Sequence, residues 1–591
     1  MMKLLDRQIY EHMKFLYGKD KADSFTPRLL NKLADFRKEH PEFVEPVQSP
    51  RLSEKDTILI TYGDMLRRKG ENPLRTLAGF LEENLAGVIS TVHILPFFPY
   101  SSDDGFSVVD YHRVNPAFGS WEDIARIGKR FRLMFDLVIN HVSVESDWFK
   151  GFLADEPKYR DFFITVEAGT DLSSVFRPRA RPLLTPFETA AGRKLVWTTF
   201  STDQADLNFH NPEVLLAVIG ILLDYVVHGA EFIRLDAVTF VWKEIGTSCI
   251  NLPQTHRFVQ LLRSVLNLAA PRVTIITETN VPHSENISYF GDGRNEAQMV
   301  YNFALPVLTL HAFHHENVAA LSSWAATLEL PSDETAFFNF LAGHDGIGIL
   351  PAKGILPEEE LDALAETAKR QGGAVSYKNN PDGSQSPYEM NINFFDALGS
   401  PADTRLDESL IVRRFLASQA IMLALRGVPG IYFHSLVGSH NWLEGVALTG
   451  RKRTINREKI SADALEKDLQ DEHSLRHQVF HGYLAMLRAR NTTRAFHPYG
   501  GQTIVSANPS IFAVVRIAPD GTDRVLCLHN VSSGRQTVTL SVGKAGFSEH
   551  GVLNDLLGQS RIKVEGESLT LTMEPFQVMW LKETGAGERD A

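Results

Sequence analysis

The 591-residue sequence predicts an α/β protein: a TIM (β/α)8 barrel with inserted loop subdomains, an N-terminal helical extension and a C-terminal β-sandwich. Two observations support this prediction. Eight short apolar segments alternate with amphipathic helical segments, and hairpin-like strands follow after about residue 500. Alternating strands and helices favour parallel β/α units, and eight strands are the number that closes a TIM barrel.

The composition indicates an ordinary globular protein, with 43% hydrophobic and 22% charged residues. The net charge of −12 argues against a general nucleic-acid or anionic-membrane partner. Cys249 and Cys527 provide no disulfide framework and no thiolate metal site, which suits a reducing compartment. The first eight residues lack the apolar segment of a signal peptide, and the most apolar run, Val214–Val227, is too short to span a bilayer. We therefore expect a soluble cytoplasmic protein, either monomer or homodimer.

The elements are predicted in chain order. Residues 1–54 form the helical extension, with helical runs such as Leu29–Phe36. Helix starts are indicated at Asn72-Pro73, Ser120–Asp123 and Asn211-Pro212, because proline and capping residues favour the first helical turn. Within the barrel, residues 55–500, the predicted strands are Ile58–Tyr62, Val88–Leu95, Leu133–Ile139, Phe232–Val238, Val273–Thr277, Met299–Phe303, Phe337–Leu341 and Ile431–Phe433.

Two connections are too long for simple β/α loops. Residues 142–205 are predicted to form a small subdomain after the third strand, and residues 346–400 form a long loop after the seventh. Long loops at the C-terminal face of a barrel usually shape its active site. In the last domain, residues 501–591, Ser510–Ile517 and Val525–Asn530 flank a Pro-Asp-Gly turn and predict a hairpin. Further strands are predicted at Thr537–Val542 and Leu569–Met573.

Arg234 and Asp236 lie two residues apart on the fourth predicted strand, so their side chains share one face. An arginine beside a carboxylate keeps it ionised, and an ionised, positioned carboxylate can act as a nucleophile. An isolated Arg-x-Asp is more often a structural ion pair, which also perturbs pKa values. The neighbouring strands decide between these interpretations.

Polar residues recur at the C-terminal ends of four predicted strands: Asp136, Asn140 and His141; Arg234 and Asp236; Glu278 and Asn280; His344 and Asp345. In a TIM barrel these ends converge on one pocket. Carboxylates buried there without a partner would be costly, which argues against a purely structural role. The set allows either a divalent metal site or glycoside chemistry with one carboxylate as nucleophile and another as general acid/base. No His-x-x-x-His or His-x-His pair supports the metal, so glycoside chemistry is favoured.

These segments resemble, in order, the four signature regions of the α-amylase superfamily. Other segments resemble its sucrose phosphorylase branch: Ile58–Asp64, His93–Phe98, Arg177–Arg179, Gly246–Cys249, His344–Gly348 and Ile455–Arg457. Within that branch the chain looks most like the glucosylglycerate phosphorylases. That likeness rests on the N-terminal extension and on Ser101–Phe106, Arg181–Phe187, Ile276–Pro282 and Asn379–Gly383.

The resemblance implies a role for each matching residue. Asp236 is expected to be the nucleophile, Glu278 the acid/base and Asp345 the stabiliser of the transition state. The glucosyl group is expected to be bound by Asp103, His141, Arg234 and His344, with Phe106 as an apolar platform. Arg179, Tyr388 and Arg453 fall where the branch contacts phosphate or acceptor. Two acceptor-side residues depart from the sucrose phosphorylase pattern, Glu389 in place of a glutamine and Asn280 in place of a histidine, which argues against sucrose.

The activity implied is retaining phosphorolysis of glucosylglycerate to α-D-glucose 1-phosphate and D-glycerate, through a β-glucosyl-enzyme and without a cofactor. Retention predicts carboxyl groups roughly 5–5.5 Å apart. We expect Arg234 to lower the pKa of Asp236 and ionised neighbours to raise that of Glu278. Lys378 is a hypothetical partner for the acceptor carboxylate. No metal is required, although distant relatives carry calcium near the Asn140 position.

Several alternatives remain beside this activity. In the same fold they are a sucrose or sucrose 6-phosphate phosphorylase, and an α-glucoside hydrolase or transglucosidase. In another class, the chain would be an inactive amylase-like binding protein, which the presence of Asp236, Glu278 and Asp345 disfavours.

Overall fold

The computed structural model describes residues 2–45, 51–380, 384–399, 407–558 and 560–583. At its centre, eight parallel strands close a barrel in the order β1-β17-β13-β12-β11-β10-β4-β3. Each of the eight predicted strands overlaps one barrel strand, so the TIM barrel prediction is confirmed. The strands are β1 (Ile58–Thr61), β3 (Thr91–Ile94), β4 (Arg132–Val138), β10 (Ala230–Asp236), β11 (Thr274–Thr277), β12 (Met299–Tyr301), β13 (Ala336–Phe340) and β17 (Val428–Tyr432).

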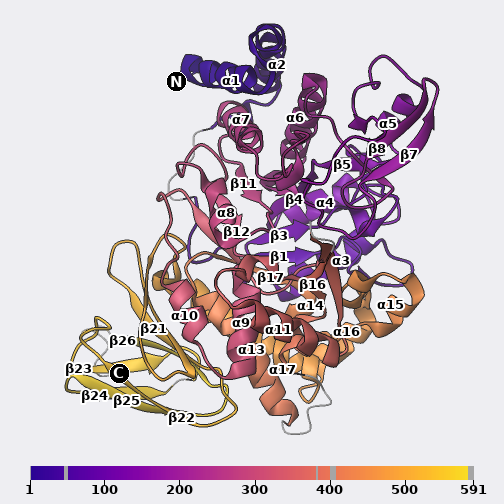
Figure 1. Cartoon of the computed structure of the whole chain (residues 1–591). Coiled ribbons are helices and arrows are strands. Elements are labelled where there is room, and N and C mark those ends of the chain that lie inside the picture. The colour runs from indigo at the N-terminus through magenta and orange to yellow at the C-terminus, as the bar shows by residue number, and fades with distance from the viewer. Residues whose placement is uncertain (1, 46–50, 381–383, 400–406, 559, 584–591) are drawn as a thin grey trace.

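Helices surround this barrel (Figure 1). The three predicted helix starts are correct. Pro73 begins α3, Ser120 and Asp123 form a capping box on α4, and the Asn211 side chain accepts a hydrogen bond from Glu213 N at the start of α6. The main barrel helices are α3 (Pro73–Asn84), α4 (Trp121–Gly128), α6 (Pro212–Val227), α7 (Pro253–Ala269), α9 (Ala304–His315), α13 (Glu408–Ala424) and α17 (Leu475–Asn491). Further helices are α8 (His283–Ile287), α10 (Ala319–Ala325), α14 (Phe433–Leu436), α15 (Leu443–Thr449) and α16 (Ala462–Gln470).

The N-terminal extension is helical, as predicted. It consists of α1 (Met2–Tyr17) and α2 (Lys19–Glu39), which lie beside α7 and α6 at the top of Figure 1. Ile9 and Leu29 are fully buried and belong to the same apolar cluster as the barrel. Arg28 of α2 also donates to both carboxylate oxygens of Glu213 of α6, at 2.7 and 3.0 Å. The extension therefore packs on the main body of the protein.

Two insertions rise from the C-terminal ends of the barrel strands. Residues 142–205 contain a small antiparallel sheet with its own apolar cluster, which includes Val166 and Trp197. Residues 346–400 contain a second sheet, whose strand β16 carries Tyr388 and Glu389. The first insertion comprises β5 (His141–Ser143), α5 (Asp147–Leu153), β6 (Thr165–Val166), β7 (Leu184–Thr189), β8 (Gly192–Trp197) and β9 (Gln204–Asp206). The second comprises β14 (Ile347–Gly348), α11 (Glu358–Arg370), β15 (Ala374–Asn379), β16 (Gln385–Asn391) and α12 (Phe394–Leu398). Residues 381–383 of the Asn379–Gly383 segment lie outside the described residues.

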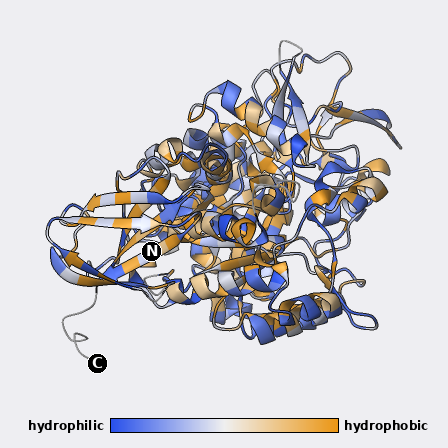
Figure 2. Cartoon of the chain, turned by 90° about the horizontal axis from the view of Figure 1, so that it is seen from below, coloured by the Kyte–Doolittle hydropathy of each residue, from blue (hydrophilic) through white to orange (hydrophobic). Residues whose placement is uncertain are grey.

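The C-terminal region is antiparallel, as predicted. It contains a six-stranded sheet and a two-stranded sheet around a separate apolar cluster. The predicted hairpin is correct, since β20 pairs with β21, and the ribbons of these sheets show both hydrophilic and hydrophobic residues (Figure 2). The strands are β19 (Gly501–Ile504), β20 (Ile511–Ile517), β21 (Arg524–Asn530), β22 (Gln536–Ser541), β23 (His550–Asp555), β24 (Arg561–Glu565), β25 (Ser568–Met573) and β26 (Val578–Glu583). Within the described part of the chain, no helix is long and apolar enough to cross a membrane.

A buried lysine joins the first insertion to the barrel. The ammonium of Lys243 lies 2.7 Å from Asp206 Oδ2 and 2.5 Å from Asn140 Oδ1, and it also donates to the carbonyl of Phe240. Asn140 in turn donates to Asp206 Oδ2 at 3.1 Å. The Asn140 position, near which distant relatives are expected to carry calcium, therefore lies beside a side-chain cation in this chain.

Replacing Lys243 by methionine should destabilise the protein by about 3–5 kcal/mol, because Asp206 would keep a buried charge without its cation. The first unfolding transition in urea would measure this loss. A double variant, Lys243→Met with Asp206→Asn, should recover part of it. An unchanged transition in the single variant would show that the ion pair does not hold the insertion in place.

Candidate active site

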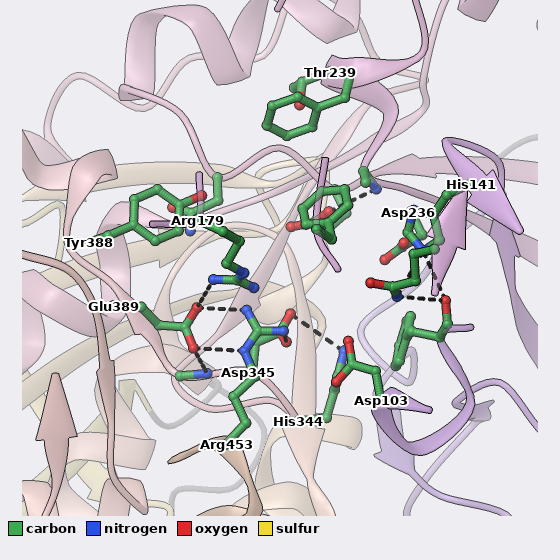
Figure 3. A pocket seen from close by; sticks show the side chains of 18 of the residues that line it. Asp103, His141, Arg179, Asp236, Thr239, His344, Asp345, Tyr388, Glu389 and Arg453 are labelled. Carbon is green, nitrogen blue, oxygen red and sulfur yellow. Dashed lines mark hydrogen bonds and ion pairs between the residues drawn. The ribbon is translucent and has the colours of Figure 1, made fainter. Parts of the chain in front are cut away.

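The C-terminal ends of the barrel strands and the two insertions enclose a cavity of about 80 Å³ (Figure 3). Twelve of the fourteen predicted site residues line it; the exceptions are Arg234 and Lys378. The lining comprises Asp103, Phe106, His141, Arg179, Phe200, Gln204, Asp236, Ala237, Thr239, Phe240, Glu278, Asn280, Phe303, His344, Asp345, Gly346, Tyr388, Glu389 and Arg453. Residues that are 242 positions apart in the sequence, Asp103 and Asp345, thus face one space.

Strand register explains why Asp236 and Glu278 are neighbours. Leu235 of β10 pairs with Thr277 of β11, so the residues that follow them lie side by side at the end of the sheet. Ala237 has left-handed backbone angles, and its N–H donates to Glu278 Oε2 at 3.0 Å. A left-handed alanine is strained, and such strain persists where the surroundings hold it in place. The turn after Asp236 therefore helps to orient Glu278.

Arg234 lies beneath this pair and contacts three carboxylates. Its Nη1 is 2.6 Å from Asp236 Oδ1 and 2.5 Å from Asp136 Oδ1, and its Nη2 is 3.9 Å from Glu278 Oε2. The arginine is only 2% exposed, and the far oxygen of Asp136 binds His93 Nε2 at 2.6 Å. One buried guanidinium thus positions Asp236 and Glu278 relative to each other.

The two neighbouring carboxyl groups are both buried, and the charge of Arg234 opposes the effect of burial on each. Burial raises the pKa of Glu278 to about 7, with help from the charges of Asp236 and Asp345 and against Arg234. The expected rise is therefore correct, although burial is its largest cause. Burial also raises the pKa of Asp236, outweighing the opposing charge of Arg234, so the predicted net lowering is wrong. Arg234 lies nearer to Asp236, at 2.6 Å, than to Glu278, at 3.9 Å, so it stabilises the ionised form of Asp236 more strongly than that of Glu278.

Asp345 completes the carboxylate group. It lies 2.5 Å from Arg453 Nη1 and 3.5 Å from Arg457 Nη2. Burial opposes its ionisation, but these arginines prevail and hold the pKa of Asp345 well below its ordinary value. Burial lowers the pKa of the adjacent His344 to about 3, so its imidazole is neutral. Asp345 is therefore a fixed negative charge in the wall of the cavity.

The expected glucosyl-binding residues form the floor and one side of the cavity. The ring of Phe106 stacks on His344 with centroids 4.4 Å apart, and its carbonyl accepts a hydrogen bond from His141 Nε2 at 2.9 Å. Asp103 and Asp104 both have left-handed backbone angles. Arg457 Nη1 holds both of their carboxylates, at 3.1 and 3.0 Å.

Sequence reasoning missed Arg457 as a site residue. It lies in the Ile455–Arg457 segment on which the family resemblance partly rests, so that segment was the available signal. Phe200, Gln204 and Thr239 also line the cavity and were missed, because the positions of these residues relative to the carboxylates depend on how the chain folds around the barrel. Gln204 donates to the carbonyl of Phe106 at 3.1 Å and thereby supports the floor of the cavity.

The opposite side of the cavity holds an arginine pair around Glu389. This carboxylate is 1% exposed, and Arg453 binds both of its oxygens, at 2.9 and 2.6 Å. Arg179 approaches it through one longer contact of 3.4 Å. Figure 3 shows Arg453 between Glu389 and Asp345, with Arg179 and Tyr388 above. Among the described residues, Arg453 is thus fully engaged, whereas most donors of Arg179 have no hydrogen-bond partner.

Gly346 brings the barrel into contact with Glu389. Its N–H donates to Glu389 Oε1 at 3.1 Å, and a Cβ at this position would lie 2.6 Å from Glu389 Cγ and from the Met390 carbonyl oxygen. Any side chain there would force apart the loop after β13 and strand β16. Glycine at this position is therefore required for the close approach that buries Glu389.

Asn280 and Lys378 differ in position. Asn280 lines the cavity, and within the described chain its Oδ1 is buried and accepts no hydrogen bond. Lys378 is not among the lining residues, and its ammonium donates to Asn380 Oδ1 at 2.8 Å. The structure therefore gives no support to Lys378 as the partner of an acceptor carboxylate. Among the residues described, no group of three or more His, Cys, Asp or Glu side chains is arranged to hold a metal ion.

Comparison with known proteins agrees with this geometry. Residues 87–346 match the model of the α-amylase catalytic domain, and residues 502–580 match that of the maltogenic amylase C-terminal domain. The chain is 50% identical to a glucosylglycerate phosphorylase from Spirochaeta thermophila, over 98% of this chain and 99% of that protein. It is 28% identical to a sucrose phosphorylase from Bifidobacterium adolescentis, over 74% of this chain and 85% of that protein.

Among solved structures, the sucrose 6F-phosphate phosphorylase from Thermoanaerobacter thermosaccharolyticum superposes with a TM-score of 0.72 and 25% identity, covering 89% of this chain and 100% of that one. The family expected from the sequence motifs is confirmed by full-length identity rather than by motifs alone. The chain therefore belongs to the glycoside phosphorylases of the α-amylase family, in its sucrose phosphorylase branch.

Proposed function

We propose that this chain catalyses the reversible phosphorolysis of glucosylglycerate to α-D-glucose 1-phosphate and D-glycerate, with retention of configuration. One observation carries the proposal: a single cavity combines a carboxyl pair on a shared guanidinium with an arginine pair on the opposite side. The carboxyl pair suits glycoside cleavage. The arginine pair suits an anionic group such as phosphate or a carboxylate, which a simple hydrolase would not need. The relatives at 45–50% identity that are named glucosylglycerate phosphorylases support this choice of substrate.

In the first step, an ionised oxygen of Asp236 attacks the anomeric carbon and the bond from that carbon to the glycerate oxygen breaks. Glu278 gives its proton to this oxygen as it leaves, so glycerate departs as a neutral alcohol at that position. The pKa of about 7 allows Glu278 to enter the step protonated. Arg234 keeps Asp236 available as an anion.

In the second step, a phosphate oxygen attacks the anomeric carbon from the side that the glycerate oxygen left, and the ester bond to Asp236 breaks. The phosphate proton passes to Glu278, which restores the starting state. Glu278 can accept this proton because Asp236 is esterified and uncharged in the intermediate. One of the charges that raises the pKa of Glu278 is then absent, so the group ionises more easily.

The remaining carboxylate and the arginines support these steps. Asp345 is a fixed anion, so it can stabilise positive charge on the sugar ring and bind hydroxyl groups most strongly at the transition state. Arg179, with most of its donors free, is our candidate for direct contact with phosphate and with the glycerate carboxylate. Asn280 Oδ1 is positioned to accept a hydrogen bond from an acceptor hydroxyl.

Incubation with glucosylglycerate and phosphate should release glucose 1-phosphate, whereas sucrose should release little. The reason is that a carboxylate on the acceptor matches the arginine pair, while fructose has no anionic group. Product analysis with and without phosphate separates the alternatives. Free glucose formed at the same rate without phosphate would indicate a hydrolase, glucose 1-phosphate formed mainly from sucrose would contradict the acceptor, and no turnover would favour a binding protein.

The activity should fall as the pH rises through about 7, because only protonated Glu278 can give its proton to the leaving oxygen. The pH profile of kcat/KM for glucosylglycerate would measure this limb. Replacement of Glu278 by glutamine should lower that activity by about 10²–10⁴-fold. With α-glucosyl fluoride, whose leaving group needs no proton, the variant should form the glucosyl-enzyme normally. A wild-type profile that stays flat to pH 9 would contradict this assignment.

Replacement of Arg179 by glutamine should raise the KM for phosphate by roughly 10–100-fold, as expected for the loss of charged hydrogen bonds. Arg179→Lys is the matched variant, since it keeps the charge and loses the planar guanidinium. Its KM for phosphate should lie between those of the wild type and the glutamine variant. Steady-state kinetics at varied phosphate would test both. Equal KM values in wild type and glutamine variant would remove Arg179 from the phosphate site.

A further inference from the structure

A second, wider cavity of about 630 Å³ opens directly outside the catalytic one. We name it the outer chamber. The two cavities share the five lining residues Asp103, Arg179, Phe200, Gln204 and Arg453, so a molecule in the outer chamber borders the catalytic cavity. The proposed function uses only the inner cavity.

The outer chamber is lined by six cationic side chains, Arg179, Arg181, Arg451, Lys452, Arg453 and Arg457. They fall into two groups. Arg179, Arg453 and Arg457 are bound to carboxylates of the inner site. The other three, Arg181, Arg451 and Lys452, are exposed and form no ion pair with any described residue.

The exposed group leaves a surplus of positive charge at the opening. Lys452 donates to the carbonyl of Val375 at 2.7 Å, which orients its ammonium without neutralising it. The chamber contains two carboxylates, Asp103 and Asp203. Asp103 is bound by Arg457, and Asp203 accepts hydrogen bonds from hydroxyl groups such as that of Ser101 at 3.1 Å. Arg451 also acts on a buried carboxylate. Burial opposes ionisation of Asp104, yet Arg457, Lys459 and Arg451 together lower its pKa.

The reaction makes such a charge useful. The protein carries a net charge of −12, so its overall field repels small anions. Each turnover proposed above nevertheless exchanges two anions, a carboxylate acceptor and phosphate, at the inner cavity. A local positive field at the entrance raises the concentration of anions there and offsets the repulsion.

We propose that Arg181, Arg451 and Lys452 make the outer chamber a binding site for small oxyanions, phosphate in particular, before they reach Arg179 in the catalytic cavity. The inference rests on the proposed function for its role in turnover, although phosphate binding in the chamber can be measured without turnover. The competing interpretation is that the outer chamber binds a neutral sugar chain on aromatic rings. Tyr377 and Phe200 line the chamber, but the ammonium of Lys369 lies over the ring of Tyr377, 5.5 Å from its centroid, where a sugar would stack.

The test compares two triple variants of the full chain that remove the same charge. One replaces Arg181, Arg451 and Lys452 by glutamine. The control replaces Lys544, Arg561 and Lys563 by glutamine. These are exposed positions of the C-terminal domain, Lys544 in the turn after β22 and the other two on β24. At low ionic strength, the chamber variant should show a KM for phosphate raised by on the order of three- to tenfold. The control should match the wild type, and the difference should shrink in 0.5 M NaCl, because salt screens exposed charges.

Two further measurements make the outcome decisive. Hydrolysis of a neutral p-nitrophenyl α-glucoside without phosphate should be equal in all three proteins; a loss in the chamber variant alone would indicate damage to the site and overturn the proposal. Calorimetric titration of each protein with phosphate should show weaker phosphate binding only in the chamber variant. Equal binding and equal KM in chamber and control variants would refute the proposal. Weaker phosphate binding in a protein that does not cleave glucosylglycerate would support the chamber and reject the proposed function.

Discussion

The active site depends on one buried guanidinium. Arg234 contacts Asp136, Asp236 and Glu278 from below the floor of the cavity and has almost no access to solvent. Carboxylates this close together would repel one another in a medium of low dielectric constant. The arginine offsets this repulsion unequally, because Asp236 lies 2.6 Å from it and Glu278 lies 3.9 Å away. That inequality gives two chemically similar groups different tasks.

Charge is balanced across the whole cavity in the same manner. Arg453 lies between Asp345 and Glu389, and Arg457 lies between Asp345 and the Asp103–Asp104 turn. These arginines lower the pKa of Asp345 and of Asp104 against the effect of burial. Arg179, by contrast, makes one longer carboxylate contact among the described residues, at 3.4 Å to Glu389. Glu389 is therefore best understood as a partner that fixes Arg453, rather than as a group that binds sugar.

The insertions supply what a bare barrel lacks. Strand β16 brings Tyr388 and Glu389 over the cavity, and the segment between β6 and β7 brings Arg179. Close packing at Gly346 ties the loop after β13 to β16. Lys243 ties the first insertion to the end of β4 through Asp206 and Asn140. The barrel thus positions Asp236, Glu278 and Asp345, and the insertions position Arg179, Tyr388 and Glu389 on the opposite side of the cavity.

The amino-acid pattern alone was sufficient to predict the eight barrel strands, the helix starts and the convergence of Asp236, Glu278 and Asp345 on one cavity. Apolar runs and capping residues are local signals, and polar residues at the ends of parallel strands converge wherever such a barrel closes. The pKa of Asp236 was predicted wrongly, because burial outweighs Arg234 and burial is not readable from neighbours in the chain. Lys378 was assigned from its charge and proximity in sequence; it lies on β15, outside the residues that line the cavity, and its ammonium donates to Asn380 Oδ1. The bidentate contact of Arg453 with Glu389 and the junction at Lys243 were decided only by tertiary structure, since each joins segments whose relative position depends on long-range packing.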